Sequence, residues 1–302
     1  MAELRVANGV TMPRTAWSGT GDSGGKGMAA RSDWRETVVA YARGAGGGLF
    51  IALPLLMTME MWWNGFYMPA WRMLLFFALN FGVLVILEHY SGFRDDSSFL
   101  EEIQDAVVAL GIGVVVSAVV LLALSVLGPG MGAREIIGKI TLEAIPVSIG
   151  ASVAMSQLGV KSAEAEHRKD RAGFGGTEAV ALAGAVLFGF TVAPTEEPMM
   201  LGLMLTPWHA LVVLILSLVI VHGLVFAVEF RGTHSIPEGT SRLRAFFDRS
   251  LTSYAIALVV AAYLLWTFGR IDAHTGVAEA LRMTLALGLA TSLGAAAGKL
   301  IL

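Results

Sequence analysis

The sequence predicts an all-α protein, a polytopic membrane helix bundle with about eight transmembrane helices. Hydrophobic residues make up 55% of the 302 residues and charged residues only 15%, whereas a soluble domain carries about 25% charged residues. The mean hydropathy is +0.68. Apolar stretches of about 20 residues, the length that crosses a bilayer, recur along the chain. A soluble enzyme and a disordered protein are therefore excluded, and the lipid bilayer is the expected partner.

The charge balance and the missing cysteines exclude further classes. The formal net charge is -3, so no basic surface attracts a nucleic acid. The chain has no cysteine, which rules out disulfides, thiolate metal sites and cysteine nucleophiles. The sequence also has no phosphate-binding loop and no paired-histidine metal motif. We therefore expect no enzyme and no cofactor apart from a bound cation.

The N-terminal region is the most polar part of the chain. Residues 1–30 contain no apolar run, so we expect a disordered tail and not a signal peptide. Residues 31–44 favour a short interfacial helix that leads into the membrane. Ser32 or Asp33 is the expected N-cap of this helix.

Eight apolar stretches follow, each judged against the length that spans a bilayer. We expect membrane spans at 45–64, 70–88, 105–127, 137–158, 178–201, 208–228, 251–268 and 280–301. Pro194 and Pro198 interrupt the fifth stretch, which can therefore also form two pieces, because proline breaks the helical hydrogen-bond ladder. The polar segment 159–177 predicts a cytoplasmic linker.

Basic residues indicate the orientation, since cytoplasmic loops are enriched in lysine and arginine. With the N-terminus in the cytoplasm, most basic residues lie near the inner face. The few that fall in the outer loops and span ends are Arg72, Arg134, Lys139, Arg270 and Arg282. We therefore expect a multi-pass protein of the bacterial inner (cytoplasmic) membrane with a cytoplasmic N-terminus.

The two halves of the chain resemble each other. A shift of 137 residues aligns the following pairs: Thr58 with Thr195, Glu60 with Glu197, Gly65 with Gly202, Trp71 with Trp208, Phe93 with Phe230 and Arg94 with Arg231. This predicts two tandem four-helix repeats, 31–158 (which includes the interfacial helix) and 178–302. Four spans per repeat give both the same orientation, which predicts parallel repeats about an axis along the membrane normal.

Four glutamates within the expected spans are the candidate functional residues. An ionisable group inside a span costs on the order of 3 kcal/mol and therefore indicates function. These residues are Glu60, Glu143, Glu196 and Glu197, and their positions along the expected spans place all of them in the outer third of the membrane. The alternative is that they only hold helices together or reach the boundary.

The surroundings of these acids suit a cation. Thr58 and Thr195 supply hydroxyls, and the carbonyls freed near Pro194 and Pro198 supply further oxygens, which are the ligands of hard cations. Glu196 and Glu197 are adjacent, so both ionise cheaply only with a cation or a proton nearby.

We therefore expect a site for a cation such as Ca²⁺, Na⁺ or K⁺, with Glu60 and Glu197 as the metal ligands. A cation channel and a cation/proton exchanger both fit these residues. A channel, assembled as a homo-oligomer with an acidic ring, is favoured because the acids are expected away from the midplane.

A second group of acids lies near the expected inner face: Glu88, Asp95, Asp96, Glu101, Glu102 and Asp105. We expect a solvated loop here, and the alternative is an inner vestibule for cations.

Three segments carry a resemblance over most of the chain. They are TMEMWW at 58–63, YSGFR at 90–94 and APTEEPMML at 193–201. With them the sequence resembles a bacterial family of integral membrane proteins of unassigned function. The resemblance implies a membrane fold and no particular activity.

A shorter stretch is similar to the intramembrane glutamate (CAAX-type) proteases that process prenylated C-termini. Glu196, Glu197 and Gly202 match their first motif, but Leu201 stands where that family has arginine. His222 is the only counterpart of their later histidines. This likeness implies the alternative function, a protease-like enzyme that uses Glu196, Glu197 and His222.

Overall fold

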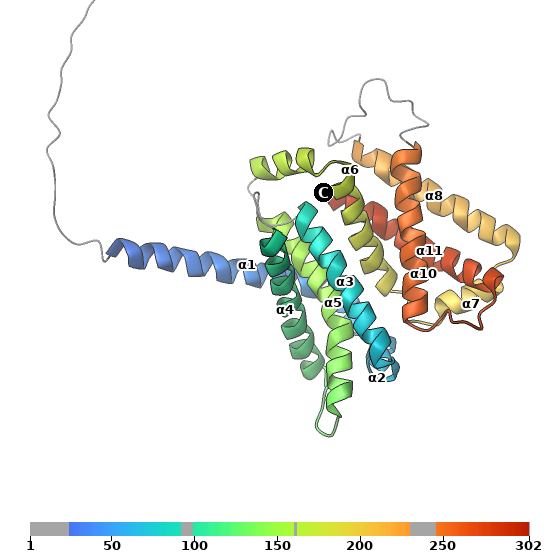
Figure 1. Ribbon diagram of the computed structural model, residues 1–302, viewed down its shortest axis with the longest axis horizontal. Helices are drawn as coiled ribbons and strands as arrows, with labels where there is room; N and C mark the ends of the chain where they lie inside the picture. The colour runs from blue at the N-terminus through green and yellow to red at the C-terminus, as the bar shows by residue number, and fades with distance from the viewer. Residues whose placement is uncertain (1–23, 92–98, 160–161, 230–245, 302) are drawn as a thin grey trace, which may run out of the picture. The chain divides into compact units, whose positions relative to one another are not determined.

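The computed structural model describes residues 24–91, 99–159, 162–229 and 246–301, and these residues form helices and turns without a strand (Figure 1). The helices are α1 (Gly24–Leu56), α2 (Met59–Tyr67), α3 (Ala70–Ser91), α4 (Phe99–Ala123), α5 (Ala133–Gly159), α6 (Ser162–Phe190), α7 (Glu197–Met204), α8 (Pro207–Glu229), the π-helix η1 (Phe246–Leu251), α10 (Thr252–Thr267) and α11 (Val277–Ile301). The predicted all-α membrane bundle is confirmed.

Seven helices in the described part of the chain are long and apolar enough to cross a membrane. They contain the candidate spans Thr37–Leu56, Ala70–Tyr90, Phe99–Ala123, Ala133–Ser156, Pro207–Leu224, Arg249–Thr267 and Val277–Lys299. The fifth predicted span, 178–201, is wrong as a continuous helix. Its apolar helical part is the shorter stretch Phe174–Phe190, and a non-helical turn separates it from α7.

The N-terminal expectations need correction. The chain divides into two units, Met1–Val39 and Ala40–Leu302, and α1 includes residues of both. Because α1 begins at Gly24, the last part of the predicted tail is helical, and Ser32 and Asp33 lie inside this helix and do not cap it. The rest of the predicted tail lies outside the described residues.

Two predicted segments have different boundaries in the structure. The linker predicted at 159–177 is mostly helical, because α6 begins at Ser162. The first predicted span, 45–64, is divided: α1 ends at Leu56, and the short helix α2 begins at Met59. A long helix followed by a break and a short helix therefore occurs in both halves.

The two halves share their order of helices and the way their short helices pack. In each half a long helix precedes a short one, α2 or α7, and further long helices follow. The short helices contact the last helix of their half, α5 or α11, through Gly65 and Gly202. A Cβ atom on Gly65 would lie 2.6 Å from the backbone nitrogen of Lys139, and one on Gly202 would lie 3.0 Å from the backbone nitrogen of Met283. The duplication remains a prediction, which this shared arrangement favours.

In each half, an arginine from another segment caps the C-terminal end of the short helix. Arg134 Nη2 donates to the carbonyl oxygen of Met68 at 3.5 Å, and Arg282 Nη1 donates to that of Leu205 at 3.2 Å. Met68 and Leu205 are the C-caps of α2 and α7. These bonds satisfy carbonyls that a helix end leaves without an intrahelical partner.

The helices differ in how much of their surface is enclosed. Residues 142–152 of α5 are all buried, which identifies a helix that is packed on every side. In contrast, α3 and α8 expose large apolar side chains such as Leu74, Leu79 and Val219, as a lipid-facing surface requires. The side chains of Phe76, Phe190 and Phe268 join the halves, with ring centroids 5.5–6.2 Å apart.

We expect Gly138→Ala to destabilise the bundle, because its Cβ would lie 1.9 Å from the Gly65 carbonyl oxygen. Overpacking of this kind costs about 1–3 kcal/mol. The matched control is Gly82→Ala in α3, where nothing lies within 4 Å of the new Cβ, and where alanine should gain about 0.5–1 kcal/mol of helix stability. Unfolding of the purified protein by SDS titration measures both, and equal effects of the two substitutions would contradict the close approach of α2 and α5.

Candidate functional site

The two helix breaks form from local sequence. After α1, Thr58 adopts an extended conformation and its Oγ1 donates to the Pro54 carbonyl oxygen at 2.7 Å. After α6, Thr195 Oγ1 donates to the Val192 carbonyl oxygen at 2.7 Å. Pro198 lies in the first turn of α7, where the missing N–H costs little. The prediction that proline divides the fifth stretch is confirmed.

The short helices that follow these breaks line one cleft. Its volume is about 580 Å³, and its lining residues come from α2, α7 with the residue before it, and the segment after α10. They are Glu60, Trp63, Asn64, Tyr67, Glu196, Glu197, Met200, Phe268 and Arg270. Three of the four predicted glutamates therefore line the same cleft, and they come from both halves of the chain.

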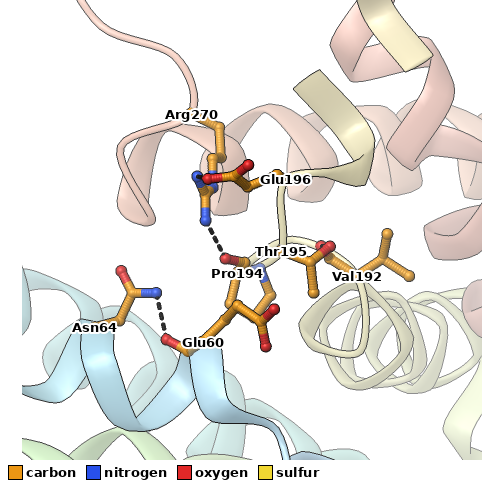
Figure 2. A network of polar contacts seen from close by, with 7 residues as sticks. All are labelled: Glu60, Asn64, Val192, Pro194, Thr195, Glu196 and Arg270. Carbon is orange, nitrogen blue, oxygen red and sulfur yellow. Dashed lines mark hydrogen bonds and ion pairs between the residues drawn. The ribbon is translucent and has the colours of Figure 1, made fainter. Parts of the chain in front are cut away.

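Arg270 is the charged residue of this cleft that was not predicted as part of the site. Its guanidinium donates to the carbonyl oxygen of Pro194, and its Nη1 lies 4.0 Å from Glu196 Oε1 (Figure 2). Gly269, with φ +73°, turns the chain directly before Arg270, a conformation that glycine adopts at little cost. The sequence did carry one signal for this residue: Arg270 is one of the few basic residues expected on the outer side of the membrane.

The carboxylates of Glu196 and Glu197 differ in which neighbouring groups stabilise their negative charge. The Glu196 side chain is 71% exposed, and an exposed pair at this distance is weak. The one hydroxyl proton of Thr195 can be donated either to the Val192 carbonyl oxygen or to the Glu197 carboxylate. Hydrogen bonding from this hydroxyl, then from the backbone N–H groups of Glu197 and Glu196, together with the charge of Arg270, holds the pKa of Glu197 below its usual range. Glu197 is therefore ionised at neutral pH.

Glu60 enters the cleft from the opposite side of the Pro194 turn. Its side chain points from α2 toward Pro194 and Thr195 in Figure 2, whereas Arg270 approaches Pro194 from the other direction. Asn64 Nδ2 donates to the backbone oxygen of Glu60 at 2.7 Å. Among the described residues, no group of three or more histidine, cysteine, aspartate or glutamate side chains is close enough to hold a metal ion. A cation bound by Glu60 and Glu197 would take its other ligands from water.

The expectation that all four acids lie inside the spans is wrong. Glu60 follows the end of the span Thr37–Leu56, and Glu196 and Glu197 follow the turn after Phe190. Glu143 lies near the middle of the span Ala133–Ser156, is fully buried and does not line the cleft. Helix breaks displaced the first three from the spans, and the earlier start of α5 placed Glu143 deeper.

His222 is not among the residues that line the cleft. Its Nδ1 lies 3.0 Å from the Ser250 hydroxyl oxygen of η1. His222 is also about 20 Å along α8 from the first residue of that helix, at a rise of about 1.5 Å per residue. The cleft lining therefore includes Glu196 and Glu197 but not His222, and the protease-like alternative stays a prediction.

The second acidic group is not simply a solvated loop. Glu88 and Glu102 are each only 6% exposed, and His89 Nδ1 lies 2.9 Å from Glu102 Oε1. Asp95 and Asp96 lie outside the described residues.

A buried ion pair that no sequence pattern indicated joins α6 and α11. Lys299 Nζ of α11 donates to Glu178 Oε1 of α6 at 2.5 Å, and the Ser253 hydroxyl lies 3.3 Å from Glu178 Oε2.

Comparison with known proteins agrees with the membrane fold. No curated protein and no solved structure matches the chain significantly. The family described as "Putative integral membrane protein (DUF2391)" matches residues 40–302, which is the whole of the unit Ala40–Leu302. The chain belongs to this family of integral membrane proteins.

Proposed function

We propose that the protein moves an inorganic cation across the membrane and that Glu60 and Glu197 bind this cation at the mouth of the path. The observation that carries the proposal is that Glu60, Glu196 and Glu197 line one cleft, although they come from different halves of the chain. Carboxylates gathered at the end of a membrane bundle concentrate cations, as acidic rings do in cation channels.

The single arginine of the cleft does not reverse this preference. Arg270 donates to Pro194 and faces Glu196, so its charge offsets one carboxylate at most. Glu60 and Glu197 then keep a net negative charge in the cleft. An anion would meet repulsion here, and Ca²⁺, Na⁺ or K⁺ would be attracted.

A channel fits the cleft better than a tight exchanger site. A cation held by two carboxylates keeps part of its water, which allows it to leave quickly, as conduction requires. We further propose a homo-oligomer in a bacterial inner membrane, with the N-terminus in the cytoplasm. In that orientation the predicted span order places the cleft at the outer face.

The test is cation flux in liposomes that contain the purified full-length chain. We expect uptake of at least one of Ca²⁺, Na⁺ and K⁺ above that of protein-free liposomes, and a lower rate for Glu197→Gln. Glu279→Gln in the first turn of α11 is the matched control, because it removes the same charge from a residue that does not line the cleft. Absence of flux for all three ions would contradict the proposal.

A further inference from the structure

Glu143 occupies the most enclosed part of the bundle. It lies within the run of buried residues 142–152 of α5, and its own exposed fraction is 0%. The apolar stretch of α5 is 72% buried, compared with 17–28% for those of α1, α3, α4 and α8. The carboxyl group is therefore out of reach of bulk water and of lipid headgroups.

Neither oxygen of this carboxyl group has a hydrogen-bond partner among the residues that the structure describes. Lys139 lies one helical turn before it, but Lys139 Nζ contacts Glu135 Oε1 at 2.7 Å and the Val126 carbonyl oxygen at 3.3 Å. The Ser148 hydroxyl donates to Ala144 at 2.5 Å. The neighbouring polar groups on α5 are thus engaged elsewhere.

The helices packed against α5 supply no counter-charge either. The titratable and charged residues described on these helices within Ala40–Leu302 are Tyr41 and Arg43 of α1, Glu60 and Tyr67 of α2, Arg72, Glu88, His89 and Tyr90 of α3, Glu101, Glu102 and Asp105 of α4, and Glu178 of α6. In the part of the chain that the structure describes, none of them forms a hydrogen bond or ion pair with Glu143.

These surroundings limit what the carboxyl group can bind. An ionised carboxylate without a partner in an apolar interior costs several kcal/mol, on the order of the penalty for any buried ion. A dehydrated metal cation needs about six oxygen ligands, and no group of three or more histidine, cysteine, aspartate or glutamate side chains in the described part of the chain could hold one. A proton needs one oxygen.

We propose that Glu143 is a proton-binding site in the middle of the membrane, separate from the cation cleft. The residue lies near the centre of the span Ala133–Ser156, where an ionisable group is costly and typical of proton pathways. The inference rests on the geometry of α5 and does not depend on the proposed function. Where both hold, cation movement depends on pH through this residue.

The experiment is infrared spectroscopy of the full-length protein in liposomes at neutral pH. We expect the C=O stretching band of a protonated carboxylic acid, moved by ¹³C-glutamate labelling, lost in Glu143→Gln and kept in the control Glu279→Gln. If Glu143→Gln does not fold, Glu143→Asp should shift the band. A wild-type spectrum without a ¹³C-sensitive band would overturn the proposal, and this outcome requires no variant.

Transfer to D₂O separates a binding site from a permanently sealed acid. A site that releases and takes up its proton exchanges it for a deuteron, and the C=O band then moves to lower frequency. A band that stays unshifted after transfer would show a sealed structural acid and would overturn the proposal. Neither spectrum measures cation flux, so failure of the proposed function leaves this test intact.

Discussion

Lys299→Met is expected to lower the free energy of unfolding by about 3–5 kcal/mol, the usual cost of removing one partner of a buried ion pair. The Lys299 and Glu178 side chains are 4% and 11% exposed, with 2.5 Å between Nζ and Oε1. Methionine keeps most of the volume of lysine and removes its charge, which leaves Glu178 buried without a cation. SDS-titration unfolding of the purified protein measures the loss.

The control for this prediction is the pair Glu178→Gln with Lys299→Met. This double variant has no unpaired buried charge, so its loss of stability should be smaller than that of Lys299→Met alone. A double variant as unstable as the single one would show that packing between α6 and α11, and not the stranded carboxylate, determines the effect.

Glu60→Gln and Glu197→Gln are each expected to reduce cation flux about tenfold, which corresponds to roughly 1.4 kcal/mol of lost cation stabilisation. Each substitution keeps the shape of the side chain and removes a charged ligand from the cleft. Glu196→Gln should have a smaller effect, since Arg270 already offsets that carboxylate. Initial rates of uptake into liposomes provide the ranking.

A different ranking would change the assignment of the ligands. If Glu196→Gln slowed flux more than Glu60→Gln and Glu197→Gln, the cation would bind on the Arg270 side of the cleft. If Glu279→Gln slowed flux equally, the effect would come from the overall charge of this end of the bundle and not from the cleft.

The sequence predicted those features of the site that depend on local chemistry. Pro194 and Pro198 indicated the break after α6, because proline cannot continue the helical ladder. The repeated Thr-x-Glu pattern at Thr58 and Thr195 indicated that Glu60 and Glu197 belong together, and the structure brings both to one cleft. These predictions needed only residue type and spacing.

The remaining features depend on how distant segments pack. Arg270 is 76 residues from Pro194, the residue to which it donates, and Lys299 is 121 residues from Glu178. Neither contact has a periodic signal in the sequence. The position of Glu143 within its span was mispredicted for a different, local reason: α5 begins at Ala133, among polar residues that hydropathy assigns to a loop.

The central claim is that Glu60 and Glu197 bind the same cation, and a double-mutant cycle on cation affinity tests it most directly. Isothermal titration calorimetry of the purified protein gives the affinity of the wild type, Glu60→Gln, Glu197→Gln and the double variant for the transported cation. Two ligands of one ion should show a coupling energy of about 0.5–3 kcal/mol. Losses that add within about 0.3–0.5 kcal/mol would place the two carboxylates in independent sites and contradict the claim.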